Sequence, residues 1–439
     1  MSFEIPSTKP KKEALDEIWY KRFEKFGAFQ AYNYLDGNLD YRKQQKDQFL
    51  SRAIENPTLD YPKLENFDFE KTEQELLDLK KDVIQQEPNE IVKQAYRWRI
   101  NEKIAELRML RATKNGDNHR FFRYSKFIYG KPEENVHNYT LLKIKDVVEK
   151  QLTNPDEDIR LAAERLNKEL FSNKEDLKSS VDIKSLDIKK SESVVNSPLL
   201  SSAEISHAFE AALEQYKLDG WSVVIEAGGA TAVNVNQEKK SVIVPEKMTA
   251  YQKEMEPLIA HELGTHALRR ESGERTRLHL LGLGLDRFLK GEEGVATYAE
   301  QKILGAEDFA GLLGHLKTAL AVGIDGKPRN FRQVFEILKD YSFIISKKEK
   351  DKALKAAQDA AWTSCVRSFR GTSCQTPGAC FTQDIVYREG NIGVWNVIKN
   401  NPDEEKRFSV GKYDPANPRH IWILEQLGIN ESDLNDLEK

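Results

Sequence analysis

The chain is poor in the residues that build disulfide-linked or structural-zinc scaffolds. Its 439 residues include only three cysteines, Cys365, Cys374 and Cys380, and no C-x-x-C pair. An odd number of thiols without a secretion signal argues against a disulfide framework, so we expect reduced, structural thiols. Residues 1–6 lack the basic flank and apolar core of a signal peptide, and no run of about 20 apolar residues occurs. We therefore expect no membrane span and, by default, a cytoplasmic location.

The chain also lacks a strong excess of charge of one sign. Its 71 acidic and 67 basic residues give a formal net charge of −4, without a long block of either sign. Proteins that bind nucleic acids usually carry a basic patch, so this pattern argues against a nucleic-acid partner. Neither a P-loop nor a G-x-G-x-x-G sequence marks a nucleotide site. With 39% hydrophobic and 31% charged residues, the composition is that of a globular protein with a well-solvated surface.

Apolar periodicity predicts helices through most of the N-terminal part. We expect them over residues 13–31, 72–83, 91–110 and 156–171. The next stretch, 172–197, is rich in Ser, Lys, Asp and Glu and poor in large apolar residues, which is typical of a linker or surface excursion. The sequence therefore predicts a helical N-terminal region at 1–171, a charged Ser-rich linker at 172–197 and a further domain at 198–439.

The C-terminal part is predicted to open with a helix and a small sheet. Ser201 and Glu204 form a capping-box pattern, which predicts a helix that runs to Tyr216. Segments rich in β-branched residues and separated by turn residues predict strands at 221–226, 231–236 and 241–245. Beyond Gln301 the pattern is mostly helical again. We therefore predict an α+β fold that is predominantly helical.

The most informative motif is the hexapeptide H-E-L-G-T-H at 261–266. In the familiar zinc-peptidase motif H-E-x-x-H, two histidines at i and i+4 share one helix face and the glutamate serves as base. Here one extra residue separates the histidines, and at ~100° per residue an i, i+5 pair on a regular α-helix diverges by roughly 140°. We therefore predict a local distortion between His261 and His266, such as a π-type turn, which costs least at Gly264.

A catalytic zinc site needs a third protein ligand, and a carboxylate on a second helix is the natural candidate. Glu292 and Glu293 follow His266 after a Gly-containing stretch that has room for a turn and a short helix. Only one of the two can point inward, because neighbours on a helix diverge by ~100°. Periodicity does not choose between them. Both glutamates would also be explained by the positive N-terminal end of a helix alone.

These motifs resemble those of the microtubule-associated tyrosine carboxypeptidases and their bacterial QEGLA-motif relatives. The hexapeptide matches the family's H-E-x-x-x-H signature, and E-E-G-V-A at 292–296 matches [QE]-E-G-L-A with Val295 in place of leucine. The resemblance extends from Ala28 to Ile429. Further similar segments are Asn56-Pro57, Tyr61-Pro62, 121–132, 367–372 and 381–384 with Tyr387.

The resemblance implies a zincin-like metallopeptidase core with the small sheet ahead of the H-E-x-x-x-H helix. It also implies Zn²⁺ bound by His261, His266 and Glu293, with Glu262 as general base for the zinc-activated water. A second donor to the developing oxyanion is expected, and Tyr387 is our candidate. The alternative for Tyr387 is a core tyrosine with a satisfied hydroxyl. One of the strands ahead of the helix could also pair with the substrate backbone.

A carboxypeptidase must also bind the free C-terminal carboxylate, for which a planar guanidinium is well suited. Arg367 and Arg370 lie three residues apart near the end of a predicted helix, just before Gly371. At least one of them could project from the helix end into a cleft. A structural role would also explain both, since basic residues are favoured at the negative end of a helix.

Together these features predict a zinc-dependent metallocarboxypeptidase that removes a C-terminal residue, with tyrosine as the residue that the resemblance suggests. Its partner would be a protein or peptide C-terminus, that of tubulin in a eukaryotic host. Two alternatives stay open: a zinc hydrolase of a small molecule, and a non-catalytic zinc-containing binding protein. Glu262 beside the first ligand argues against the latter, because a structural zinc site needs no base.

Overall fold

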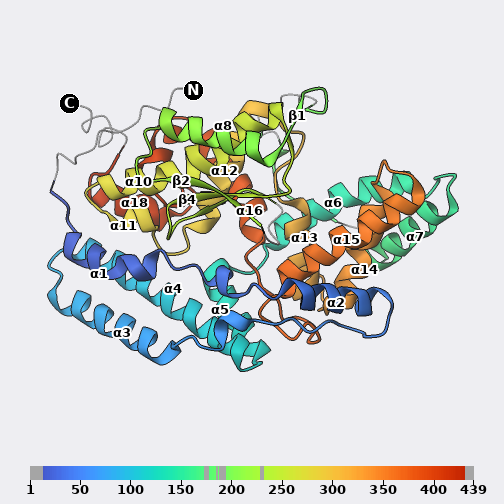
Figure 1. Ribbon diagram of the computed structural model, residues 1–439, viewed down its shortest axis with the longest axis horizontal. Coiled ribbons are helices and arrows are strands. Elements are labelled where there is room, and N and C mark those ends of the chain that lie inside the picture. Colours follow the sequence, from blue (N-terminus) through green and yellow to red (C-terminus); the bar gives the residue numbers. More distant parts are fainter. Residues whose placement is uncertain (1–12, 173–176, 184–185, 187–193, 228–231, 431–439) are drawn as a thin grey trace.

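The computed structural model shows a predominantly helical α+β protein (Figure 1). It describes residues 13–172, 177–183, 186, 194–227 and 232–430. The predicted fold class is confirmed at this level, because the strands of the described residues form two small sheets. Half of the predicted linker at 172–197 lies outside the described residues, so the division into regions at this point stays a prediction.

Helices joined by short connections make up the N-terminal half. They are α1 (Glu17–Gly27), α2 (Leu39–Leu50), α3 (Phe69–Gln86), α4 (Glu90–Lys114), α5 (Asn118–Tyr129), α6 (Glu134–Gln151) and α7 (Glu157–Phe171), with 3-10 turns η1 (Ala31–Tyr34) and η2 (Pro62–Leu64). Asp68, Asn89, Asp117 and Asp156 cap α3, α4, α5 and α7, because each side chain accepts a hydrogen bond from a backbone amide of the first turn. Such caps satisfy amides that a helix leaves unpaired at its start.

The first helix is shorter than the apolar periodicity predicts. A helix is expected over 13–31, but α1 begins at Glu17 and ends at Gly27. The residues before it make tertiary contacts instead: the Asp16 carboxylate accepts hydrogen bonds from the backbone amides of His279 (2.8 Å) and Leu280 (2.9 Å). Asp16 therefore caps a distant helix, α11 (Leu280–Leu283), and local sequence contains no sign of that partnership.

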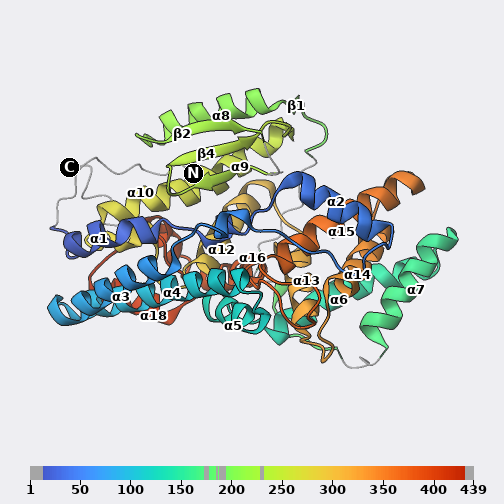
Figure 2. The same cartoon turned by 60° about the horizontal axis from the view of Figure 1, so that its bottom comes forward.

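A three-stranded sheet follows helix α8 (Ser202–Gln215), which begins with the predicted capping box of Ser201 and Glu204. The strands β2 (Ser222–Glu226), β3 (Asn234–Asn236) and β4 (Ser241–Pro245) are arranged in the order β2-β4-β3, with β2 parallel and β3 antiparallel to β4. A second sheet pairs β1 (Leu199–Leu200) with β5 (Ala250–Tyr251). Figure 2 shows α8 and the larger sheet as a layer on one side of α9 and α10.

The described residues from Gln252 onward contain helices and no further strands. The helical elements are η4 (Gln252–Glu254), α9 (Met255–His261), the π-helical segment η5 (Glu262–Ala267), α10 (Leu268–Arg275), α11, α12 (Leu289–Leu304), α13 (Leu312–Val322), α14 (Phe331–Ile344), α15 (Lys350–Phe369), α16 (Ile385–Asn400), α17 (Glu404–Arg407), η6 (Phe408–Val410) and α18 (Pro418–Gln426). Helices α12 and α16 pack closely at Gly294, because this residue has no side chain. A Cβ there would clash with the backbone of Gly390. This close approach holds the side chains of α12 near those of α16.

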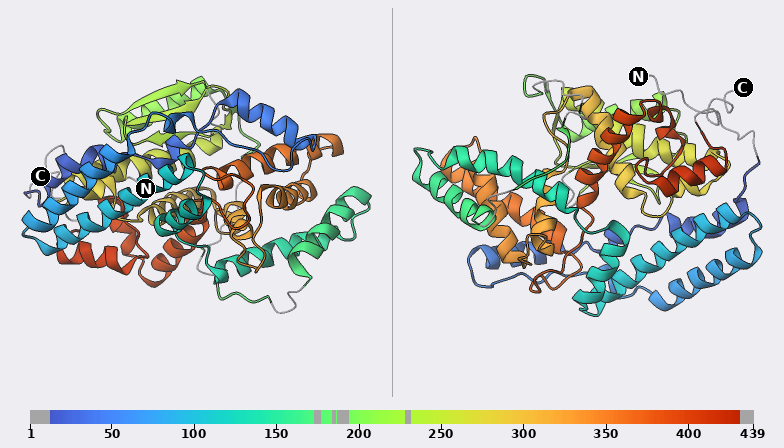
Figure 3. Two further views of the ribbon diagram at one scale, coloured as in Figure 1. Left: turned by 90° about the horizontal axis from the view of Figure 1, so that it is seen from below. Right: turned by 180° about the vertical axis from the view of Figure 1, so that it is seen from behind.

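Two large apolar cores join the N-terminal helices to the C-terminal ones. One core contains Phe23 of α1 and Tyr96 of α4 together with residues of α11 and α18. The other contains Phe49 of α2 and residues of α6 and α7, packed against Phe331 of α14 and Trp362 of α15. Both sets of helices can be followed in Figure 3. Within the described ranges, no helix combines the length and apolarity that crossing a bilayer requires.

Candidate metal centre

The helix that carries the two histidines has the predicted distortion. Helix α9 ends at His261, the π-helical segment covers Glu262–Ala267, and α10 continues from Leu268. In a π turn the hydrogen bonds run from i to i+5, so residues five apart lie on the same side of the helix. The rings of His261 and His266 consequently lie next to each other, edge to face, with centroids 5.0 Å apart and ring planes at 76°. The prediction of a local distortion between the two histidines is confirmed.

The opposite side of the π-helical segment anchors it to the sheet layer. Leu263 and Ala267 are fully buried in a core that also contains Phe209 of α8 and Val242 of β4. Leu263 and Ala267 are four residues apart, while the histidines are five apart. One side of the distorted helix therefore packs in an apolar core. The other side carries His261 and His266, which point towards α12.

Three potential metal donors converge at this face. The Nε2 atoms of His261 and His266 lie 3.8 and 3.9 Å from Oε2 of Glu293 on α12, and one ligand atom from each residue lies within 4.8 Å of the others. These distances are too long for hydrogen bonds. Oε2 of Glu293 is buried and has no hydrogen-bond partner among the described residues. Two imidazole nitrogens and an unpartnered carboxylate oxygen fit the donor set of a catalytic zinc site.

Glu292, the neighbour of Glu293, lies in a buried ion cluster. Its carboxylate contacts Nδ1 of His266 (3.0 Å), Nη1 of Arg269 (2.6 Å) and the ammonium group of Lys412. Although burial alone would raise the pKa of Glu292, Lys412 and Arg269 hold it well below its usual range. Glu292 is therefore a charged partner of His266 on the side of the ring that faces away from Glu293.

His261 also has a carboxylate beside it, that of Glu300 near the end of α12, although the contact is an ion pair by distance and Nδ1 has no hydrogen-bond partner among the described residues. Its Nδ1 lies 2.9 Å from Oε1 of Glu300. Burial alone would lower the pKa of His261, but Glu300, together with Glu262 and Glu293, raises it to about 10. Glu300 was not among the site residues predicted from the sequence. The available signal was its position seven residues after Glu293, because residues seven apart share a helix face.

Glu262 lies in the π-helical segment between the two histidines and is buried. Burial raises the pKa of its carboxyl group, while His261 and His266 act in the opposite direction. A carboxyl group with a raised pKa is a more effective proton acceptor near neutral pH than an exposed one. The position and the protonation chemistry of Glu262 both suit a general base.

Tyr387 lies between one of the three donors, Glu293, and one of the two predicted arginines, Arg367. It lies on α16, and the charge of Glu293 is the main cause that raises the pKa of its hydroxyl well above the usual value. The hydroxyl also interacts with Arg367. Arg367, however, is already paired with Asp384, with contacts of 2.7 Å from Nη2 and 3.3 Å from Nε. Asp384 in turn contacts Lys317.

Arg370 has no carboxylate partner of this kind among the described residues. It directly follows helix α15, and its side chain is buried. The guanidinium carbon lies 4.3 Å from the ring centroid of Tyr32 in η1. Its Nε and Nη1 atoms are buried without a hydrogen-bond partner among the described residues. Because an unpaired buried charge is costly, Arg370 is the arginine better suited to receive an anionic ligand.

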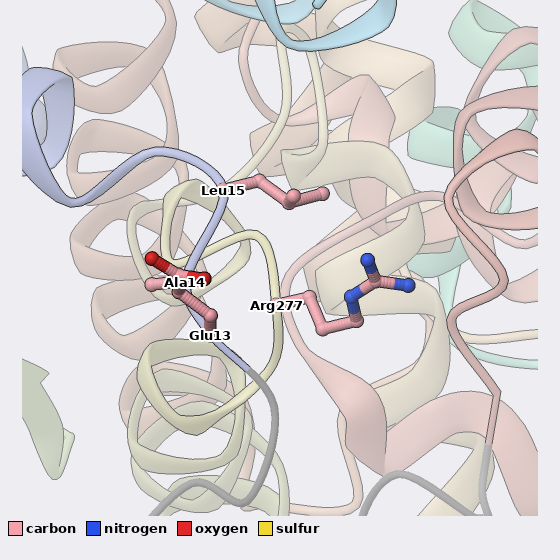
Figure 4. A pocket seen from close by; sticks show the side chains of 4 residues that line it. All are labelled: Glu13, Ala14, Leu15 and Arg277. Carbon is pink, nitrogen blue, oxygen red and sulfur yellow. The ribbon is translucent and has the colours of Figure 1, made fainter.

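A separate hollow lies beside the start of the described chain. Glu13, Ala14, Leu15 and Arg277 line it, as Figure 4 shows. None of the residues predicted for catalysis or metal binding contributes to this hollow. We therefore assign it no part in the chemistry at the histidines.

Comparison with known proteins agrees with the motifs. A family model described as microtubule-associated tyrosine carboxypeptidase matches residues 47–185 and 163–432. The chain belongs to this family. No curated protein and no solved structure matches it. Membership confirms the resemblance inferred from the motifs, and it indicates a peptidase with tyrosine carboxypeptidase-like activity.

Proposed function

We propose that the protein is a zinc-dependent carboxypeptidase, with zinc held by His261, His266 and Glu293. The observation that carries this proposal is the buried, unpartnered Oε2 of Glu293, which lies 3.8 and 3.9 Å from the two Nε2 atoms. When bound there, zinc would lower the pKa of a water molecule from about 15.7 towards about 7 and polarise the substrate carbonyl. The zincin-like character of the core is part of the same proposal.

The chain itself supplies the proton transfers. Glu262 accepts the proton of the attacking water and delivers it to the departing amine. Tyr387 donates a hydrogen bond to the carbonyl oxygen as negative charge develops on it. The raised pKa of Tyr387 supports this role, since it keeps the hydroxyl protonated near neutral pH.

We assign recognition of the substrate's terminal carboxylate to Arg370. Its Nε and Nη1 atoms, which have no hydrogen-bond partner among the described residues, leave this guanidinium able to donate to a carboxylate. The guanidinium of Arg367 is engaged by Asp384, so Arg367 serves in this scheme to orient Tyr387. The substrate backbone would pair with the edge strand β3, because β3 packs against the π-helical segment.

The substrate class follows from family membership. Tyrosine at a protein C-terminus is the proposed cleaved residue, and tubulin is the proposed protein partner in a eukaryotic host. We also propose a cytoplasmic location.

Peptides with free and with amidated C-termini test this function directly. We expect loss of a single terminal residue from free peptides only, with tyrosine-ended peptides cleaved fastest, and no turnover by the Glu262→Gln variant. Equal cleavage of amidated peptides would indicate an endopeptidase. Complete inactivity of the zinc-loaded protein on peptides would favour the small-molecule hydrolase or the binding protein.

A further inference from the structure

Helix α12 presents carboxylates to both ends of the His261 ring. Glu293 and Glu300 are seven residues apart, which places them on nearly the same helix face and about 10.5 Å apart along the axis. The imidazole of His261 lies between them. Its Nε2 is 3.8 Å from Glu293 and its Nδ1 is 2.9 Å from Glu300.

We propose that Glu300 is a positioning residue that fixes the orientation and tautomer of His261 for metal binding. The inference rests on the proposed zinc site. A neutral imidazole that ligates through Nε2 carries its proton on Nδ1, and the group that accepts a hydrogen bond from that proton determines the ring orientation. Oε1 of Glu300 is the carboxylate oxygen placed for that role: it lies 2.9 Å from Nδ1, on the side of the ring away from Glu293, where Nδ1 forms no aligned hydrogen bond with any described residue.

The partner of His266 shows why Glu300 is the residue to test. Glu292 has 2% of its side chain exposed and contacts both Arg269 and Lys412. Its replacement would leave two buried cations without their carboxylate, which destabilises the fold. Glu300 has 35% of its side chain exposed, so the chain can tolerate its substitution. Both histidines therefore have a carboxylate close to Nδ1, but only that of His266 is aligned as a hydrogen bond, and the two carboxylates differ in their importance for folding.

Zinc affinity of the metal-free full-length protein measures this role without reference to activity. We expect Glu300→Ala to weaken zinc binding about 10–100-fold in competition with a chromogenic chelator. Glu300→Gln should lose much less, because its amide oxygen can still accept a hydrogen bond from Nδ1. The matched control is Glu307→Ala, which removes an exposed glutamate beyond the end of α12 and should bind zinc like the parent protein.

Two further results complete the test. The visible spectrum of the cobalt-substituted protein should change in Glu300→Ala and remain unchanged in Glu307→Ala, since the spectrum reports ligand geometry. A Glu300→Ala protein with the parent's zinc affinity and cobalt spectrum would refute the positioning role, even if its melting temperature fell. Absence of zinc binding by the parent protein would instead refute the proposed function, and the role of Glu300 with it.

Discussion

The same substitution should have different effects at the neighbouring glutamates Glu292 and Glu293: one variant should lose stability of the fold, and the other should lose zinc affinity. Replacing either by glutamine removes one negative charge and keeps the shape of the side chain. Oε2 of Glu293 accepts no hydrogen bond from any residue that the structure describes, so Glu293→Gln should leave the fold intact and weaken zinc binding. Glu292 neutralises Arg269 and Lys412, so Glu292→Gln should destabilise the fold itself.

The magnitudes follow from the environment of each carboxylate. Glu293 would be one of only three protein ligands to zinc, so the loss of its charge should weaken zinc binding by more than the about 10–100-fold caused by loss of a residue that only orients a ligand. Breaking a buried ion pair by removing one partner costs about 3–5 kcal/mol. The side chains of Glu292, Arg269 and Lys412 are 2%, 1% and 4% exposed, so we expect Glu292→Gln to lower the free energy of unfolding by an amount in that range.

Two measurements on each variant separate these effects. Urea denaturation in the presence of EDTA gives the free energy of unfolding without metal, and chelator competition gives the zinc dissociation constant. Glu307→Gln serves as the control, because it makes the same chemical change at an exposed position. The reasoning would be refuted by parent-like zinc affinity in Glu293→Gln, or by parent-like stability of Glu292→Gln in EDTA.

Three further predictions concern the base, the carboxylate-binding arginine and a buried histidine. Glu262→Gln should bind zinc normally and lose at least about 100-fold in kcat, the usual contribution of a general base; parent-like turnover would contradict this role. Arg370→Lys keeps the charge but loses the planar guanidinium, so it should raise KM for peptides with a free C-terminus about 10–100-fold, equivalent to about 1.5–3 kcal/mol. Arg367→Lys should change KM less. An unchanged KM in Arg370→Lys would show that another group binds the carboxylate. Burial lowers the pKa of His420 to about 3, below its unfolded value of about 6.5. Its contribution to stability is therefore complete above pH 6.5 and is lost as the pH falls towards 3, with a slope of at most about 1.4 kcal/mol per pH unit. Urea denaturation between pH 4 and 7 should show a shallower slope for His420→Asn than for the parent; equal slopes would contradict the neutral buried state.

Local features of the fold could be predicted from sequence because neighbouring residues determine them. The spacing of His261 and His266 predicts the π-helical distortion, since any regular helix would turn the two rings apart. Ser201 and Glu204 predict the start of α8 because both capping contacts lie within four residues. Prediction failed at the start of α1, where the partner of Asp16 is more than 250 residues away.

The composition of the candidate metal centre beyond its motif depends on tertiary packing. The sequence alone indicated two histidines and a glutamate as candidate metal donors, and the extra residue in H-E-x-x-x-H predicted a helix distortion between the histidines. Periodicity left Glu292 and Glu293 equivalent; they are distinguished by the Arg269 and Lys412 cations around one and the imidazoles around the other. In the same way, Asp384 engages Arg367 while Arg370 stays unpaired against Tyr32. How distant helices pack decides which partner reaches a charged group. The reason is that the partners come from residues far away in the sequence, so the local pattern around the charged residue does not specify them.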